Sequence, residues 1–113
     1  MNIQIFGSKK NSDSRKAERF FKERGIKFQY IDMNDKGLSY GEFKSVLNAV
    51  KDIENMIDNE NRDKDLLSLL KYMTPEGKTE KLFENQHIIL LPIVRNGKDA
   101  TVGYKPEIWK NWN

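Results

Sequence analysis

The stretch HIILLPIVRNGKDATVG, residues 87–103, decides the fold. Its apolar run is halted by Pro92 and resumes as a strand over residues 93–95. Asn96-Gly97 has the composition of a tight turn, and residues 100–103 return as a second strand. This is the strongest β signal in the chain, and it predicts a β-hairpin close to the C-terminal end.

A helix is predicted after the hairpin, because Pro106 is a typical first-turn residue. Ile108, Trp109 and Trp112 then share one face, which favours docking of this helix onto the sheet over stacking of the tryptophans on a nucleobase. The only histidine, His87, is expected at the surface at the end of a strand. Alone it cannot form a metal site, so no metal is predicted.

The N-terminal segment predicts a β-α-β unit. Residues 3–6 form a short apolar run that ends at Gly7, and a helix over about residues 13–24 ends at Gly25. Residues 26–31 alternate with the period of a strand. The two predicted strands therefore enclose one helix.

The middle of the chain is predicted to be helical. Ser39 and Glu42 form a capping box, so a helix begins there. Residues 58–63 are interpreted as a connector, residues 66–73 as a short buried helix, and Thr74 as the cap of a further helix. Apolar side chains that recur at helical spacing form the predicted stripe Phe43, Val46, Leu47, Val50, Ile53, Met56 and Ile57.

The order of these elements predicts an α/β fold. A four-stranded mixed sheet carries a helical insertion, at about residues 40–85, between its β-α-β and β-β-α halves. With 113 residues the chain fits a single domain, 1–113. No apolar run approaches ~18 residues and no apolar leader is visible at the start, so we expect a cytoplasmic protein without membrane contact.

The composition excludes thiol chemistry and argues against direct nucleic-acid binding. The chain has no cysteine, and therefore no disulfide, thiolate metal site or redox switch. Its net charge of +3 is modest for a nucleic-acid binder. The basic excess lies in residues 1–27, where Lys16 and Arg19 mark a helix face suited to an acidic partner; an ordinary solvated face is the simpler alternative.

The loop over residues 7–15 runs from a strand into a helix, where backbone N–H groups and the positive end of the helix dipole converge. Ser12, Ser14 and Arg15 could hold an oxyanion there if their side chains turned inward. Asn11 or Ser12 acting as an ordinary N-cap explains the same residues without a ligand. Serine catalysis is not expected, because no base is evident beside these hydroxyls.

Several motifs, in order, resemble the arsenate reductase family, the ArsC/Spx group with a thioredoxin-like fold, over nearly the whole chain. Residues 11–15 (NSDSR) stand where the family has Cys-Ser/Thr-x-Ser/Cys-Arg, which puts Asn11 in the place of the nucleophilic cysteine. Residues 91–94 (LPIV) look like the family's Arg-Pro-Ile-Val segment, with Pro92 as the expected cis-proline. Residues 102–104 look like the end of its closing hairpin, before a terminal helix.

The departures from the family pattern imply a redox-inactive bacterial member. In the family a cysteine thiolate attacks arsenate while arginines hold the oxyanion, but here Asn11 and Leu91 stand at two of those positions. Ser14 stands where the Spx branch carries its second redox cysteine. The preferred hypothesis is a protein-interaction or regulatory module rather than an enzyme. The Spx branch suggests the RNA polymerase alpha subunit as its partner.

The alternative is a glutathione- or oxyanion-binding, reductase-like enzyme that uses an external thiol. Glutathione would then be its only cofactor. The ligand would be held by the loop and the backbone near the proline, at Asn11, Ser12, Ser14, Arg15 and Pro92.

Overall fold

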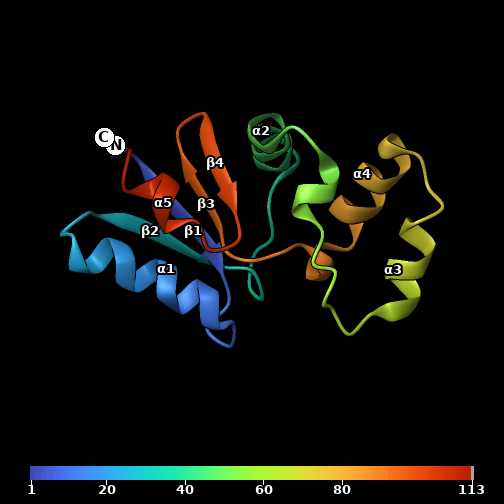
Figure 1. The fold of residues 1–113 in the computed structure, drawn as a ribbon, viewed down its shortest axis with the longest axis horizontal. Coiled ribbons are helices and arrows are strands. Elements are labelled where there is room, and N and C mark those ends of the chain that lie inside the picture. The colour runs from blue at the N-terminus through green and yellow to red at the C-terminus, as the bar shows by residue number, and fades with distance from the viewer. Residues whose placement is uncertain (113) are drawn as a thin grey trace.

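Four strands build one sheet, which lies in the left half of the molecule as drawn in Figure 1. The computed structural model describes residues 1–112. The strands are β1 (Ile3–Gly7), β2 (Phe28–Asp32), β3 (Ile93–Asn96) and β4 (Asp99–Val102). They lie in the order β2-β1-β3-β4, with β1 parallel to β2 and the other two pairs antiparallel. The predicted mixed sheet is confirmed.

Helices α1 (Ser12–Glu23) and α5 (Pro106–Trp109) cover one face of the sheet. The core of this face consists of Ile3, Ile5, Ala17, Phe20, Phe21, Val94 and Trp109. Docking of the last helix through Trp109 is confirmed. The same prediction is wrong for Ile108, which is 41% exposed, because a single helical turn cannot direct two adjacent side chains at the sheet.

The insertion packs on the other face. It contains the helices α2 (Tyr40–Val50), α3 (Lys64–Leu70) and α4 (Pro75–Glu84) and the 3-10 helices η1 (Ile53–Met56) and η2 (Gln86–Ile88). The predicted capping box starts α2: the Ser39 hydroxyl accepts from Glu42 N–H at 3.1 Å, and Ser39 N–H donates to the Glu42 carboxylate at 2.9 Å. Phe43 and Val46 carry the α2 stripe into the core.

Two details of the insertion differ from the prediction. Leu69 is 48% exposed, because α3 lies at the end of the molecule farthest from the sheet and packs against neighbours on one side only (Figure 1). His87 lies in η2 rather than in a strand, and the apolar residues after it contribute one isolated bridge, Ile57 to Ile89. None of the helices in residues 1–112 has the length and apolar character needed to cross a membrane.

The second half of the sheet brings Pro92 beside the loop after β1. The Leu91–Pro92 peptide bond is cis, as expected, and β3 begins at the next residue. Ile93 pairs with Phe6, and the turn at Gly97, with φ of 62°, returns the chain along β4. The end of β1 and the start of β3 therefore lie at one edge of the sheet.

Candidate functional site

The loop between β1 and α1 is organised by Asn11 and Ser14. Asn11 is the N-cap of α1, and its side-chain oxygen accepts from Ser14 N–H at 2.7 Å and from the Ser14 hydroxyl at 2.8 Å. The buried Ser14 hydroxyl in turn accepts from Ser8 N–H at 3.2 Å. This packing needs glycine at the end of β1, because a Cβ on Gly7 would lie 2.7 Å from the Ser14 oxygen.

Residues at the start of α1 satisfy backbone N–H groups there and place a negative charge near the positive end of the helix dipole. Asn11 N–H donates to the Ser8 carbonyl at 2.9 Å, and Ser14 N–H donates to the cap. Asp13 adds a negative charge in the first turn, where the helix dipole is positive. Of the two N-cap candidates left open by the sequence, Asn11 is the cap.

Tyr30 reaches the same end of β1. A Cβ on Gly7 would lie 3.0 Å from the Tyr30 hydroxyl. Burial, followed by the nearby carboxylates of Glu18 and Asp32, raises the pKa of Tyr30. The phenol therefore stays protonated at neutral pH and adds no charge beside the cap.

The five residues predicted to bind a ligand do not converge on one space. Ser12 is exposed, and the Ser14 hydroxyl is engaged in the cap. The Arg15 guanidinium folds back and donates to the Lys9 carbonyl at 2.6 Å. Pro92 is buried and does not line the cleft. Of the five, only Asn11 lines the neighbouring cleft.

That cleft has a volume of about 600 Å³ and separates the β1–α1 loop from the connector and η2. Its charged lining is balanced, because two cations, Lys10 and Arg62, are matched in number by two carboxylates, Asp58 and Glu60. Such a lining lacks the cationic excess typical of an oxyanion site. The complete lining is Ser8, Lys10, Asn11, Met33, Asn34, Asp58, Glu60, Asn61, Arg62, Gln86, His87 and Leu91.

The sequence did not identify Asn34, Arg62 or His87 as lining residues. They come from the turn after β2, the connector and η2, which are far apart along the chain. No spacing pattern could link them, because only the packing of the insertion against the sheet brings them together.

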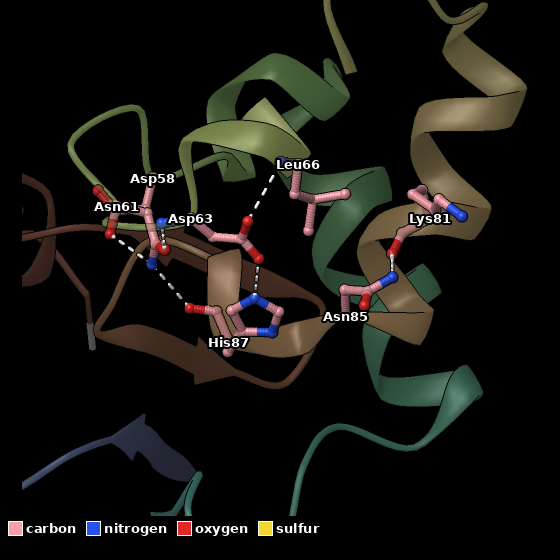
Figure 2. Close-up of polar contacts among 7 residues, drawn as sticks. All are labelled: Asp58, Asn61, Asp63, Leu66, Lys81, Asn85 and His87. Atoms are coloured by element: carbon pink, nitrogen blue, oxygen red, sulfur yellow. Dashed lines mark hydrogen bonds and ion pairs between the residues drawn. The ribbon is translucent and has the colours of Figure 1, made fainter. Parts of the chain in front are cut away.

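A hydrogen-bonded network holds the connector against η2 (Figure 2). Asp63 is the N-cap of α3: one carboxylate oxygen accepts from Leu66 N–H at 3.2 Å, and the other lies 2.8 Å from His87 Nε2. The Asn61 amide donates to the His87 carbonyl at 3.0 Å. Among residues 1–112, no group of three or more His, Asp or Glu side chains is placed to hold a metal ion.

The Asp63 contacts predict an acid-sensitive insertion. The hydrogen bond from the His87 ring, and then that from Leu66 N–H, lower the pKa of Asp63. A carboxylate whose pKa is lower in the folded state stabilises the fold above its unfolded pKa, and this contribution disappears as the pH falls through the folded value. We therefore expect the free energy of unfolding to fall more steeply below about pH 4 in the wild type than in Asp63→Asn.

Urea denaturation between about pH 5 and pH 2 measures this difference. Asn still caps a helix, so the variant keeps α3 while losing the titration. Asp65→Asn removes an exposed carboxylate from the same helix and serves as the charge control. Parallel pH profiles for wild type and Asp63→Asn would contradict the assignment.

The cap itself predicts a stability effect. Asn11→Ala removes the acceptor for both Ser14 groups, so the free energy of unfolding should drop by about 1–2 kcal/mol. Asn11→Asp keeps an acceptor in the same place and should lie within about 0.5 kcal/mol of the wild type. Chemical denaturation of the two variants side by side measures both values. An equal loss of stability in Asn11→Ala and Asn11→Asp would show that the hydrogen bonds of the cap do not account for the effect.

Lys16 and Arg19, the predicted basic face, lie on the exposed side of α1. Lys16 Nζ is 3.7 Å from Asp13 and 5.7 Å from the ring centroid of Tyr104. Both cations line a groove of about 410 Å³ between α1 and the segment that leads into α5. This groove shares no lining residue with the cleft.

Comparison with known proteins identifies similar molecules. The ArsC family profile matches residues 6–112. A Bacteroides fragilis protein described as ArsC family related is 22% identical, with a TM-score of 0.85 over 97% of this chain and 96% of the other. An arsenate reductase from Vibrio cholerae is also 22% identical, with a TM-score of 0.81 over 96% and 94%. These two likenesses establish the thioredoxin-like fold. No curated protein sequence matches the chain.

Proposed function

We propose that this chain, which belongs to the ArsC family, acts in the cytoplasm as a protein-interaction module without thiol chemistry of its own. The observation that carries this proposal is Asn11. The chain has no cysteine, and the amide at the position where the family places its nucleophile is used as a helix cap. An amide has no thiolate form, so it can neither attack an oxyanion nor form a disulfide.

The distribution of charge supports a partner rather than a small anion. The cleft has a balanced lining, and Arg15 is bonded back to its own loop. In contrast, Lys16 and Arg19 are exposed on a basic helix face. Such a face increases the association rate with an acidic partner. The RNA polymerase alpha subunit, suggested by resemblance to the Spx branch, is the first partner to test.

The test uses the intact chain and purified alpha subunit. We expect saturable binding in a sedimentation or calorimetric titration, weakened by salt and by the double reversal Lys16→Glu/Arg19→Glu. If the alpha subunit does not bind, affinity capture from native extract extends the search. A captured protein counts only if it rebinds in purified form at a defined stoichiometry. Recovery of no such partner at any salt concentration would overturn the proposal.

A second candidate function is binding of glutathione or an oxyanion for reaction with an external thiol. The observation that favours it is the size of the cleft, which has Asn11, Lys10 and Arg62 in its lining. The test is an amide-resolved NMR titration of the labelled protein with glutathione, phosphate and arsenate, following residues 8–15, 91 and 93. We expect no shifts at millimolar ligand and no arsenate reduction in the presence of glutathione. Saturable shifts together with turnover would favour this second function.

A further inference from the structure

The groove between α1 and α5 combines three features that a flat solvated helix face lacks: concentrated cations, exposed aromatic surface and a concave shape. Residues 1–27 hold eight basic against three acidic residues, whereas residues 28–113 hold twelve basic against fourteen acidic. The positive charge of the molecule is therefore concentrated around α1. Complementary surfaces attract through such an imbalance.

Most of the α1 cations have no ion partner within residues 1–112. The pair found there, Lys16 with Asp13, spans 3.7 Å between side chains that are half exposed, so it contributes little. Arg19 and Lys22 are exposed and form no ion pair in this part of the chain. These charges remain available to a partner.

Aromatic rings restrain two of the three cations in the groove, Arg24 and Lys16. The Arg24 guanidinium lies 3.7 Å from the ring centroid of Phe20 and donates to the Phe20 carbonyl at 3.4 Å. Lys16 lies over Tyr104 in the same way, at 5.7 Å. Stacking of this kind restricts the cation before any partner arrives, which lowers the entropy cost of binding.

The groove also has an apolar wall. Tyr104 is 40% exposed and packs edge-on against the buried Trp109, with centroids 5.6 Å apart, so its ring is supported from behind. Pro106 continues this wall, and Glu23 is the only acidic residue in the lining. A ring held by a rigid neighbour is the kind of surface that binds an apolar side chain at a protein interface.

We propose that the α1–α5 groove, lined by Lys16, Arg19, Arg24 and Tyr104, binds an extended acidic segment of a partner protein that carries an aromatic side chain. The carboxylates of the segment pair with the cations, and its aromatic ring packs on Tyr104. This proposal rests on the proposed interaction function and specifies the chemistry of the partner. A peptide is favoured over a nucleic acid because the net charge of the chain is only +3, which is modest for a nucleic-acid binder.

The test uses the full chain and a fluorescein-labelled peptide of Asp and Glu residues around one central Phe, followed by fluorescence anisotropy. Arg19→Glu should weaken binding about tenfold. Lys22→Glu makes the same change in charge on the same helix but outside the groove, and should cost less than about threefold. An equal loss of affinity in the two variants would overturn the proposal that the groove is the binding site. It would show that the peptide responds only to the total charge of α1.

The aromatic part of the proposal is tested separately. Tyr104→Ala should weaken the Phe peptide about tenfold and a matched peptide with Ser in place of Phe by less than about threefold, because the Ser peptide loses only the contact that restrains Lys16. Circular dichroism checks that the variant is folded. Equal effects on both peptides would overturn the aromatic contact. Single-stranded DNA binding with the same dependence on Arg19 and Tyr104, or dimerisation of the chain through this groove, would replace the proposed occupant with another.

These outcomes separate the groove from the interaction function. If an identified partner binds wild type and Arg19→Glu equally well, the groove is not the binding site, but the proposed interaction function is still supported. If the peptide binds with the expected dependence and no protein partner is found, the groove's chemistry stands and the interaction function fails.

Discussion

Asn11→Cys should give this cysteine-free chain a reactive thiol. The new sulfur would stand at the N-cap of α1, where unsatisfied N–H groups and the helix dipole stabilise a thiolate. Cysteines at helix N-termini have a pKa of about 3.5–7.5, compared with about 8.5 for a free thiol. At pH 7 we therefore expect a thiolate fraction roughly ten- to thirtyfold above that of an ordinary exposed cysteine, seen as a lower midpoint in the pH profile of alkylation by iodoacetamide.

The control for this experiment is Ser68→Cys, an exposed position within α3 and away from a helix N-terminus. Mass spectrometry over a pH series gives the alkylation rate and the thiol pKa of each variant. A pKa for Asn11→Cys that matches the control would show that this helix end does not stabilise an anion. The native chain would then have lost more than its sulfur relative to the family pattern.

Trp109→Ala should be the most destabilising single change considered for this protein. Trp109 is 1% exposed, its ring contacts Phe20 and Phe21 at centroid distances of 5.3 and 5.4 Å, and Nε1 donates to the buried Thr101 hydroxyl at 2.7 Å. Truncating a buried tryptophan costs about 3–5 kcal/mol. The orphaned Thr101 hydroxyl adds a desolvation cost of about 1 kcal/mol or more.

Guanidinium denaturation followed by far-UV circular dichroism measures this loss without relying on tryptophan fluorescence. Trp112→Ala is the matched control, because Trp112 is half-buried at the edge of the same cluster and should cost roughly a third as much. Trp109→Phe keeps much of the packing and should recover part of the loss. Similar values for Trp109→Ala and Trp112→Ala would contradict the central position of Trp109.

The elements that could be predicted are those with local signals. The capping box at Ser39 and the turn at Gly97 depend on neighbouring residues, and both occur as expected. The exposure of Leu69 and Ile108 could not be predicted in this way, because their periodicity is helical whether or not another element packs against them. Burial depends on tertiary packing, which a single helix does not encode.

In the candidate site, too, local features could be predicted and features that depend on tertiary packing could not. The N-cap was one of two readings of a short motif, and the choice between Asn11 and Ser12 depends on backbone geometry. Arg15 belongs to the family motif, but its side chain bonds Lys9 and lies outside the cleft. Arg62 and His87 reach the cleft from the insertion. These two residues line the cleft because the insertion packs against the sheet. No spacing in the sequence could predict that.

The absence of cysteine also bears on which side chains of the protein an oxidant can modify. Peroxide changes proteins first at exposed thiolates and then at accessible thioethers. Here the first class does not occur. Of the four methionines, Met56 is fully buried, Met33 and Met73 are half-buried, and Met1 is 58% exposed. The α1–α5 groove has neither cysteine nor methionine in its lining, so peroxide stress that modifies cysteine-bearing proteins leaves this surface chemically unchanged.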